Sequence, residues 1–299
     1  MYQEHLNKIQ ACLDNPIKEV KTLDKIEHSE FRSKYLKKNR PIALTGMMEN
    51  WEATKTWSLD YFKKIGKDKE SFMATANNFQ EDTQWQYGSF IDSIEKIEKS
   101  DNVKDSGYLM NLSIMHMFPE LVNHVDYSLV SDNKTRQSIS LWIGPKGTIT
   151  PWHTDRLADN ILCVVKGHKL VLLADPNQSK YMHISKKYEP GSKISLVDME
   201  DFDESKYPLY KKHVNVQYTI LEPGKMVFIP KQWWHCVYGL DTCISSNNFC
   251  FSFVDNLRMK SEELSKRVLH KAGMYGKDCV CHFTDENGKR QRYRHLSAQ

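Results

Sequence analysis

The sequence predicts a mostly β fold: a double-stranded β-helix (jelly-roll) barrel, with a mixed α/β region before it and a helical extension after it. From Ile139 to Val254 the chain consists of short β-rich runs separated by Gly, Pro and Asp. Eight such runs with turn signals between them are typical of a jelly-roll, whose two sheets enclose a cavity. The expected strands are 139–143, 148–153, 160–165, 169–173, 217–221, 226–229, 235–238 and 243–254.

Helical patterns flank these strands on both sides. Residues 29–38 carry apolar side chains at helical spacing, Ser58 is placed to cap a helix over 59–65 that stops at Gly66, and 90–97 has an isoleucine stripe. A short strand is expected over 41–45. We therefore divide the chain into an N-terminal supporting region (1–107), the jelly-roll core (108–255) and a C-terminal helix with a basic tail (256–299).

The C-terminal helix is expected to begin at Ser261, as its N-cap, and to end at Gly273. Its apolar stripe would either pack on the barrel or pair with the same helix of a second copy, because an amphipathic stripe alone does not name its partner. The stripe consists of Leu264, Val268, Leu269 and Ala272.

Composition excludes several classes of protein. The 299 residues are 40% hydrophobic and 27% charged, as in ordinary globular proteins, and the longest apolar runs are strand-length, so no membrane partner is expected. The first residues lack the pattern of a secretion signal. Seven scattered cysteines, an odd number, do not form a disulfide framework, which favours a reducing cytoplasmic or nuclear location. A net charge of +4 neither requires nor excludes a nucleic-acid partner.

Three residues carry the chemistry. His153 and Asp155 stand two apart in T-P-W-H-T-D, and His235 ends F-I-P-K-Q-W-W-H. Side chains two apart on a strand point to the same side, so the first two can bind one ion. Two imidazoles and a carboxylate are the ligand set of non-haem Fe(II) sites that activate dioxygen. A Cys-x-Cys-His run at 279–282 makes a poor zinc site by comparison, because it lacks a second ligand pair.

The wider motifs resemble a known family. They are L-W-I-G-P-K-G-T-I-T-P-W-H-T-D, D-N-I-L-C-V-V-K-G-H-K and E-P-G-K-M-V-F-I-P-K-Q-W-W-H. They are similar to the JmjC-domain iron and 2-oxoglutarate oxygenases of the cupin type. Within these, the chain most resembles the small hydroxylases: the asparaginyl hydroxylase that inhibits hypoxia-inducible factor, the JmjC-only arginyl hydroxylases and the hydroxylase of the tRNA base wybutosine. The resemblance covers residues 40–254.

The resemblance implies roles for further residues. Iron would be held by His153, Asp155 and His235. Lys169 matches the lysine that pairs with the distal carboxylate of 2-oxoglutarate, and a buried carboxylate needs such a cation. The remaining matches are co-substrate contacts: the hydroxyls of Thr150 and Tyr108 at the same carboxylate, Asn160 beside the co-substrate, and Asn248 near the metal.

The chain departs from the family pattern at two places. Four residues, Arg-Leu-Ala-Asp, separate Asp155 from Asn160 where three are usual, which puts the role of Asn160 in doubt. Phe249-Cys250 replaces an aromatic pair after the second asparagine. Trp142 is expected to pack within the barrel, although it stands where relatives have a wall of the substrate site.

The resemblance implies an oxygenase that uses Fe(II), 2-oxoglutarate and dioxygen, and that hydroxylates a side chain of a protein substrate. The polar insertion 180–213 could hold a peptide. The alternatives are hydroxylation of a modified tRNA base, which the basic tail would favour, and a binding module that has lost activity. A demethylase is less expected, because no reader or zinc module accompanies the domain.

Overall fold

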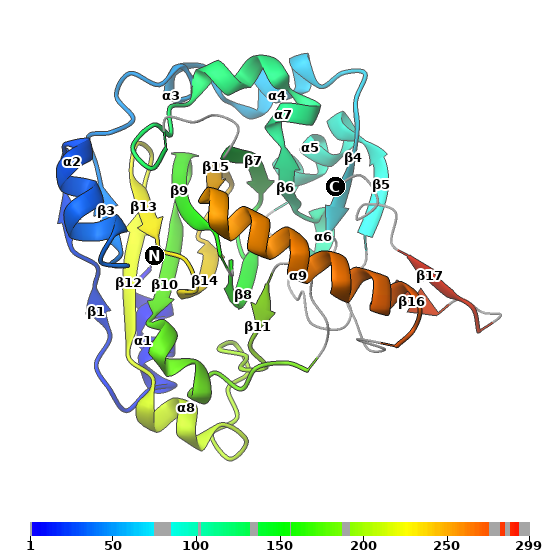
Figure 1. Ribbon diagram of the computed structural model, residues 1–299. Helices are drawn as coiled ribbons and strands as arrows, with labels where there is room; N and C mark the ends of the chain where they lie inside the picture. Colours follow the sequence, from blue (N-terminus) through cyan, green and yellow to red (C-terminus); the bar gives the residue numbers. More distant parts are fainter. Residues whose placement is uncertain are drawn as a thin grey trace.

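A computed structural model of the chain describes residues 2–74, 85–100, 103–131, 137–155, 157–186, 192–274, 282–284 and 288–292. Two β-sheets lie against each other, with helices around their ends and outer faces (Figure 1). Both sheets have two edge strands among the described residues. The architecture is therefore an open two-sheet jelly-roll and not a closed barrel.

The first sheet has six strands and the second has seven. The first contains, in spatial order, β1 (Lys18–Glu19), β12 (Val216–Leu221), β10 (Lys169–Ala174), β14 (Trp234–Gly239), β8 (Ile149–Thr154) and β11 (Lys193–Ile194). The second contains β2 (Thr22–Leu23), β3 (Ile42–Leu44), β13 (Met226–Ile229), β9 (Asp159–Lys166), β15 (Cys243–Cys250), β7 (Gln137–Gly144) and β6 (Leu109–Ser113). Two hairpins lie outside them, β4 (Glu70–Ala74) with β5 (Trp85–Ser89) and β16 (His282–Thr284) with β17 (Arg290–Arg292).

The jelly-roll prediction is confirmed by how the eight expected strands are divided. Strands β7, β9, β13 and β15 lie in the second sheet, whereas β8, β10, β12 and β14 lie in the first. Short N-terminal strands extend both sheets, since β1 pairs with β12 and β3 pairs with β13. The chain before residue 107 thus contributes strands to the core as well as covering it.

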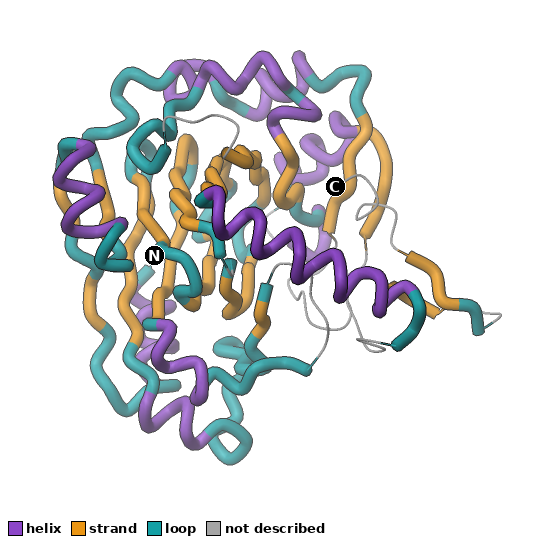
Figure 2. Tube along the Cα trace, in the orientation of Figure 1, coloured by secondary structure: helices purple, strands orange, loops and turns teal. Residues whose placement is uncertain are grey.

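The helices lie around the sheets, as the purple segments of Figure 2 show. They are α1 (Gln3–Ala11), α2 (His28–Phe31), α3 (Glu52–Thr56), α4 (Leu59–Ile65), α5 (Phe90–Lys99), α6 (Val103–Ser106), α7 (Ile114–Met117), α8 (Pro208–His213) and α9 (Phe253–Lys271). Helix α4 has the expected cap, because Ser58 accepts from the Tyr61 backbone N–H. Helix α2 continues as a π-helical turn over Arg32–Leu36. None of the helices described has the length and hydropathy needed to cross a bilayer.

Three large apolar clusters hold these layers together. One fills the space between the sheets and includes Leu162, Val171 and Val237. A second covers the outer face of the second sheet with the N-terminal helices, where Phe31 meets Phe228 edge-on at 4.9 Å between ring centroids. The third covers the outer face of the first sheet.

The insertion expected over 180–213 belongs to this third cluster. Its Tyr210 is fully buried, together with Trp152 and Trp234 of the first sheet. Strand β11 of the insertion pairs with β8. Much of the insertion therefore packs on the sheet as part of the core, and residues 187–191 lie outside the described ones.

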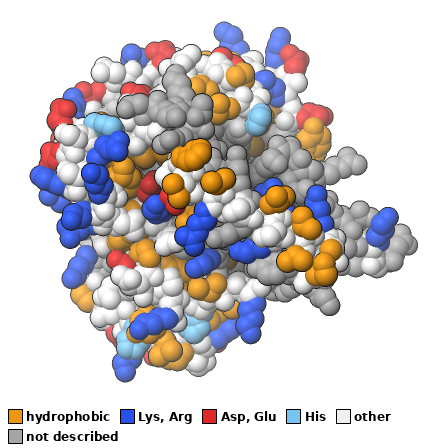
Figure 3. Space-filling model, in the orientation of Figure 1, with side chains coloured by type: hydrophobic (Ala, Val, Ile, Leu, Met, Phe, Trp, Pro, Cys, Tyr) orange, Lys and Arg blue, Asp and Glu red, His pale blue; other side chains and the backbone are white. Residues whose placement is uncertain are grey.

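The C-terminal helix begins at Phe253, nine residues before the expected first helical residue. Ser252 is its N-cap and accepts from the Asp255 N–H, whereas Ser261 lies within the helix and donates to the Arg258 carbonyl. The expected strand 243–254 accordingly ends at Cys250. Apolar side chains of α9 are exposed, among them Leu257, Leu264 and Val268 (Figure 3). Pairing of this helix with a second copy stays a prediction.

Candidate metal centre

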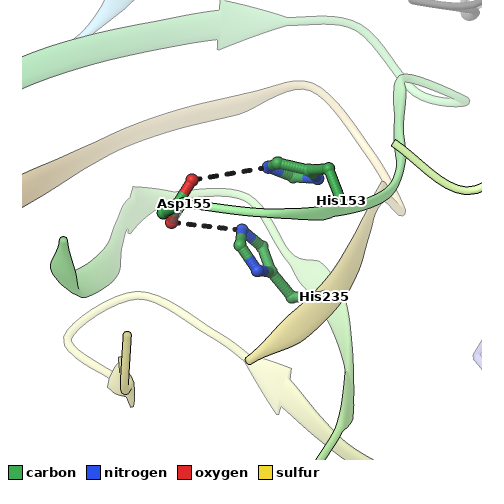
Figure 4. A group of neighbouring side chains, drawn as sticks. All are labelled: His153, Asp155 and His235. Atoms are coloured by element: carbon green, nitrogen blue, oxygen red, sulfur yellow. Dashed lines mark ion pairs between the residues drawn. The ribbon is translucent and has the colours of Figure 1, made fainter. Parts of the chain in front are cut away.

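The two histidines and the aspartate expected to bind a metal come together between β8 and β14. These strands are antiparallel neighbours, and His235 stands directly opposite His153. Asp155 follows the last residue of β8, so its carboxylate reaches the same side (Figure 4). Its Oδ1 lies 3.7 Å from Nε2 of His153, and its Oδ2 lies 3.4 Å from Nε2 of His235. One ligand atom from each residue lies within 4.8 Å of the others.

Backbone carbonyls hold both imidazole rings in the orientation a metal requires. Nδ1 of His153 lies 2.7 Å from the Pro151 carbonyl oxygen, and Nδ1 of His235 lies 3.1 Å from that of Trp233. A carbonyl only accepts, so each Nδ1 carries the proton and each Nε2 keeps its lone pair. Both lone pairs are therefore available at the carboxylate, as in metal sites whose histidines are oriented by their second nitrogen.

The charge state of the site also suits a metal. Burial lowers the pKa of His153 to about 4, and the nearby His235 adds to this effect while Asp155 opposes it. The His153 imidazole is consequently neutral at neutral pH. Metal binding requires imidazole in its neutral form and carboxylate in its ionised form, so this histidine loses no proton on loading.

A chain of three hydrogen bonds leads from the second sheet to the carboxylate. The indole Nε1 of Trp142 donates to Oδ1 of Asn247 at 2.7 Å, and Nδ2 of Asn247 donates to Oδ1 of Asn160 at 3.0 Å. Nδ2 of Asn160 then donates to Oδ2 of Asp155 at 2.8 Å. The first three residues stand on β7, β15 and β9, which are adjacent strands. The second sheet thus orients a ligand that the first sheet carries.

The unusual spacer does not remove Asn160 from the site. The Ala158 N–H donates to the Asp155 carbonyl at 3.0 Å, which closes a turn between β8 and β9. Strand β9 starts at Asp159, one residue before Asn160. The extra residue is absorbed by this turn, of which Arg156 lies outside the described residues.

Asn248 lies on the opposite face of β15 from Asn247. Its Oδ1 accepts from the backbone N–H of Ser138, on the adjacent strand, at 3.1 Å. Neighbouring residues of a strand face opposite sides, so the two asparagines cannot both face the site. The site therefore contains Asn247, which the sequence reasoning missed, and the expectation for Asn248 is wrong.

Deeper between the sheets lies a buried cation without a counter-charge. Lys169 is 3% exposed, and its Nζ donates to the Tyr108 hydroxyl oxygen at 3.2 Å. No carboxylate among the described residues pairs with it. Burial lowers the pKa of the Lys169 ammonium, but Tyr108, Cys243 and Cys163 together raise it by more, so the net shift is upward. Thr150, also buried, interacts with the same Tyr108 hydroxyl, so three polar side chains expected from the sequence converge here.

Comparison with known proteins identifies the family. A family model described as a cupin-like domain matches residues 28–254. The chain belongs to this cupin-like family. It is 30% identical over 241 residues to JmjC domain-containing protein D of Dictyostelium discoideum, covering 73% of this chain and 53% of that protein. It is 29% identical over 230 residues to lysine-specific demethylase 8 of Xenopus tropicalis, covering 74% of this chain and 49% of that protein.

A third relative is the plant protein named lysine-specific demethylase JMJ30, from Arabidopsis thaliana. The identity is 27% over 251 residues, which cover 80% of this chain and 56% of the plant protein. The chain thus spans about half the length of the curated relatives it matches. The JmjC resemblance of the motifs is confirmed by these relatives. The segment that matches the family model contains His153, Asp155 and His235.

Proposed function

We propose that this cupin-like protein is an Fe(II)- and 2-oxoglutarate-dependent oxygenase that hydroxylates a side chain of a protein substrate. One observation carries the proposal: a two-histidine, one-carboxylate cluster stands on β8 and β14, and the neighbouring strand β10 carries a buried lysine that pairs with no acidic side chain among the described residues. The first feature fits a ferrous ion and the second fits an anionic co-substrate.

The donor set fits a ferrous ion better than magnesium, which prefers oxygen ligands. Two neutral imidazoles and one carboxylate on one side are typical of non-haem Fe(II) oxygenases. Catalytic zinc can use the same three ligands, so the choice of iron over zinc rests on the JmjC relatives. His153, Asp155 and His235 would hold the ion. Bound there with 2-oxoglutarate, ferrous iron supplies the activation of dioxygen that no side chain of this chain provides.

The position of Lys169 suits a short dicarboxylate. Strand β10 places Leu173 opposite His235, so Lys169 stands four residues further along the neighbouring strand. Four residues of strand span about 13 Å, and an extended lysine side chain covers part of this distance. The remaining gap suits a five-carbon diacid that reaches from the metal to the ammonium. Lys169 with Tyr108 and Thr150 would bind its distal carboxylate, and the apolar walls would exclude water.

A protein side chain is the substrate that the relatives favour. Two of those described above are named lysine-specific demethylases. Oxidative removal of an N-methyl group begins with hydroxylation of the methyl carbon, so demethylation and stable hydroxylation share one chemistry. A modified tRNA base is the alternative substrate. The basic tail behind this alternative is described only in part, with Arg290–Arg292 forming β17 and residues 293–299 outside the described ones.

Turnover of 2-oxoglutarate tests the proposed activity. We expect the purified full chain, given Fe(II), ascorbate and dioxygen, to convert 2-oxoglutarate to succinate. His153→Ala should abolish this conversion, while His116→Ala, which alters an exposed histidine of α7, should leave it unchanged. No succinate above that of the His153→Ala variant would support a binding module without activity.

Product mass identifies the substrate class. Incubation with cell extract from which the active protein is absent should yield a peptide that gains one oxygen when 2-oxoglutarate is added. Loss of a methyl group from lysine would assign a demethylase instead. A tRNA nucleoside that gains the oxygen, with no change in any peptide, would contradict the proposed protein substrate.

A further inference from the structure

Trp142 lies in the second sheet, whereas the metal-binding histidines lie in the first, yet it begins the chain of hydrogen bonds that ends at Asp155. It stands on β7, and Asn247 and Asn160 connect it to the carboxylate. Both asparagines are at least 95% buried, with exposed fractions of 1% for Asn247 and 5% for Asn160. Water therefore competes little for their amide groups.

The three hydrogen bonds run in one direction, from donor to acceptor, and the Trp142 indole sets that direction. An indole nitrogen donates and never accepts, so the Asn247 amide must present its oxygen to Trp142. Its NH₂ group then faces Asn160, whose oxygen accepts. This leaves the NH₂ group of Asn160 facing the Asp155 carboxylate. Each amide could otherwise turn by 180° with little change in shape.

The opposite direction would harm the site. If Asn160 turned, its carbonyl oxygen would face an ionised carboxylate oxygen at hydrogen-bond distance. Two electronegative atoms would then meet in a buried environment, where repulsion is weakly screened. Asp155 would rotate away or accept a proton, and either change removes a metal ligand. The direction of the two amides therefore matters for metal affinity.

We propose that Trp142 is a positioning residue for the metal centre: its indole N–H fixes the orientation of Asn247 and Asn160, and through them holds the Asp155 carboxylate ready to bind the ion. This inference rests on the proposed metal site and adds to it a residue three hydrogen bonds away. It assigns Trp142 a role beyond packing, in which the N–H group acts and not only the ring.

Metal affinity of the full chain tests this role without turnover. Mn²⁺, which is stable in air, is titrated into the protein and followed by electron paramagnetic resonance. Trp142→Phe keeps an aromatic ring at this half-buried position and removes only the N–H donor. We expect it to weaken Mn²⁺ binding about tenfold, within the range seen for groups that orient metal ligands. Trp57→Phe is the matched control. It also removes one indole N–H donor, but Nε1 of Trp57 donates to His124 and takes no part in the hydrogen bonds that lead to Asp155.

A second variant separates the chain of hydrogen bonds from a local packing effect. Asn160→Leu has nearly the shape of asparagine and removes the last donor, so we expect a loss of about 10- to 100-fold in Mn²⁺ affinity. If Trp142 acts only through Asn160, the double variant that combines Trp142→Phe with Asn160→Leu binds Mn²⁺ as weakly as Asn160→Leu alone. Additive losses would overturn the proposal.

Two other outcomes distinguish this proposal from the proposed function. Equal Mn²⁺ affinity of Trp142→Phe, Trp57→Phe and the unaltered protein would overturn the role of Trp142 and leave the metal site intact. Failure of the unaltered protein to bind Mn²⁺ at all would overturn both the metal site and the positioning role.

Discussion

The Lys169 ammonium and the Tyr108 hydroxyl form a buried pair, 3.2 Å apart, to which the described part of the chain supplies no carboxylate. An ammonium taken out of water without a counter-charge destabilises a fold. The Lys169 ammonium also lies near two aromatic rings. Its Nζ is 5.7 Å from the ring centroid of Tyr108 and 5.9 Å from that of Trp142. These contacts offset part of the cost and leave a strong preference for an anion.

Lys169→Met tests this preference for an anion. Methionine has a similar volume and no charge, so the variant should raise the KM for 2-oxoglutarate about 10- to 100-fold, the worth of a charge-assisted hydrogen bond. Mn²⁺ affinity should stay the same, because Lys169 is not a metal ligand. Steady-state kinetics and a Mn²⁺ titration measure the two effects separately.

The same variant should not weaken the fold in the absence of co-substrate. Removing an uncompensated buried charge leaves the free energy of unfolding equal or higher, which urea denaturation measures. Lys212→Met, at an exposed lysine of α8, is the control and should alter neither quantity. A large loss of stability in Lys169→Met with an unchanged KM would show that the lysine serves the fold alone.

Asp159 makes stability depend on pH. Burial raises the pKa of Asp159 to about 6, with Lys231 opposing this shift and Asp255 adding to it. The folded state therefore holds the proton more tightly than the unfolded chain, whose pKa is 3.8. This contribution to stability is complete below pH 3.8 and is lost as pH rises through 6.

Asp159→Asn should accordingly stabilise the protein at pH 7.5 by about 2 kcal/mol, because the amide keeps an acceptor for the Lys231 N–H and avoids a buried charge. The gain should shrink as pH falls and vanish near pH 4. Urea unfolding of both proteins across this pH range measures the difference. A gain that is independent of pH would contradict the titration of Asp159.

The start of α9 can be tested at its cap. Ser252 accepts from the Asp255 N–H at 3.0 Å and donates to the Asp255 carboxylate at 2.6 Å. Ser252→Ala should destabilise the first turn by about 1 kcal/mol, seen as faster amide hydrogen exchange in α9. Ser261→Ala should not accelerate exchange, since alanine is the better helix former within a helix. The reverse pattern would restore Ser261 as the cap.

The sequence predicts the sheets well because inward and outward side chains follow a period of two. All eight core strands lie within two residues of their expected bounds, except at the end of β15. There the β-rich composition of residues 251–254 suggested a longer strand, while the Ser252 cap and Asp255 start a helix. The hydrogen bonds of the Ser252 cap therefore outweigh the strand propensity of the residues beside it.

The candidate metal site was also predicted only in part. His153, Asp155 and His235 could be predicted because motif spacing and strand alternation place them together. Which of the two adjacent asparagines, Asn247 or Asn248, faces the metal site could not be predicted. That depends on the register of β15 against β7, where Asn247 pairs with Ser140. The hydrogen bond from Trp142 to Asn247 joins residues 105 positions apart and leaves no local pattern.

The shared metal ligand set is the central claim, and diffraction tests it most directly. Crystals of the full chain soaked with Mn²⁺ should give, in an anomalous difference map, one strong peak about 2.0–2.3 Å from Nε2 of His153, Nε2 of His235 and a carboxylate oxygen of Asp155. The peak should disappear in His235→Ala. A peak at other residues, or no peak at a saturating Mn²⁺ concentration, would contradict the account.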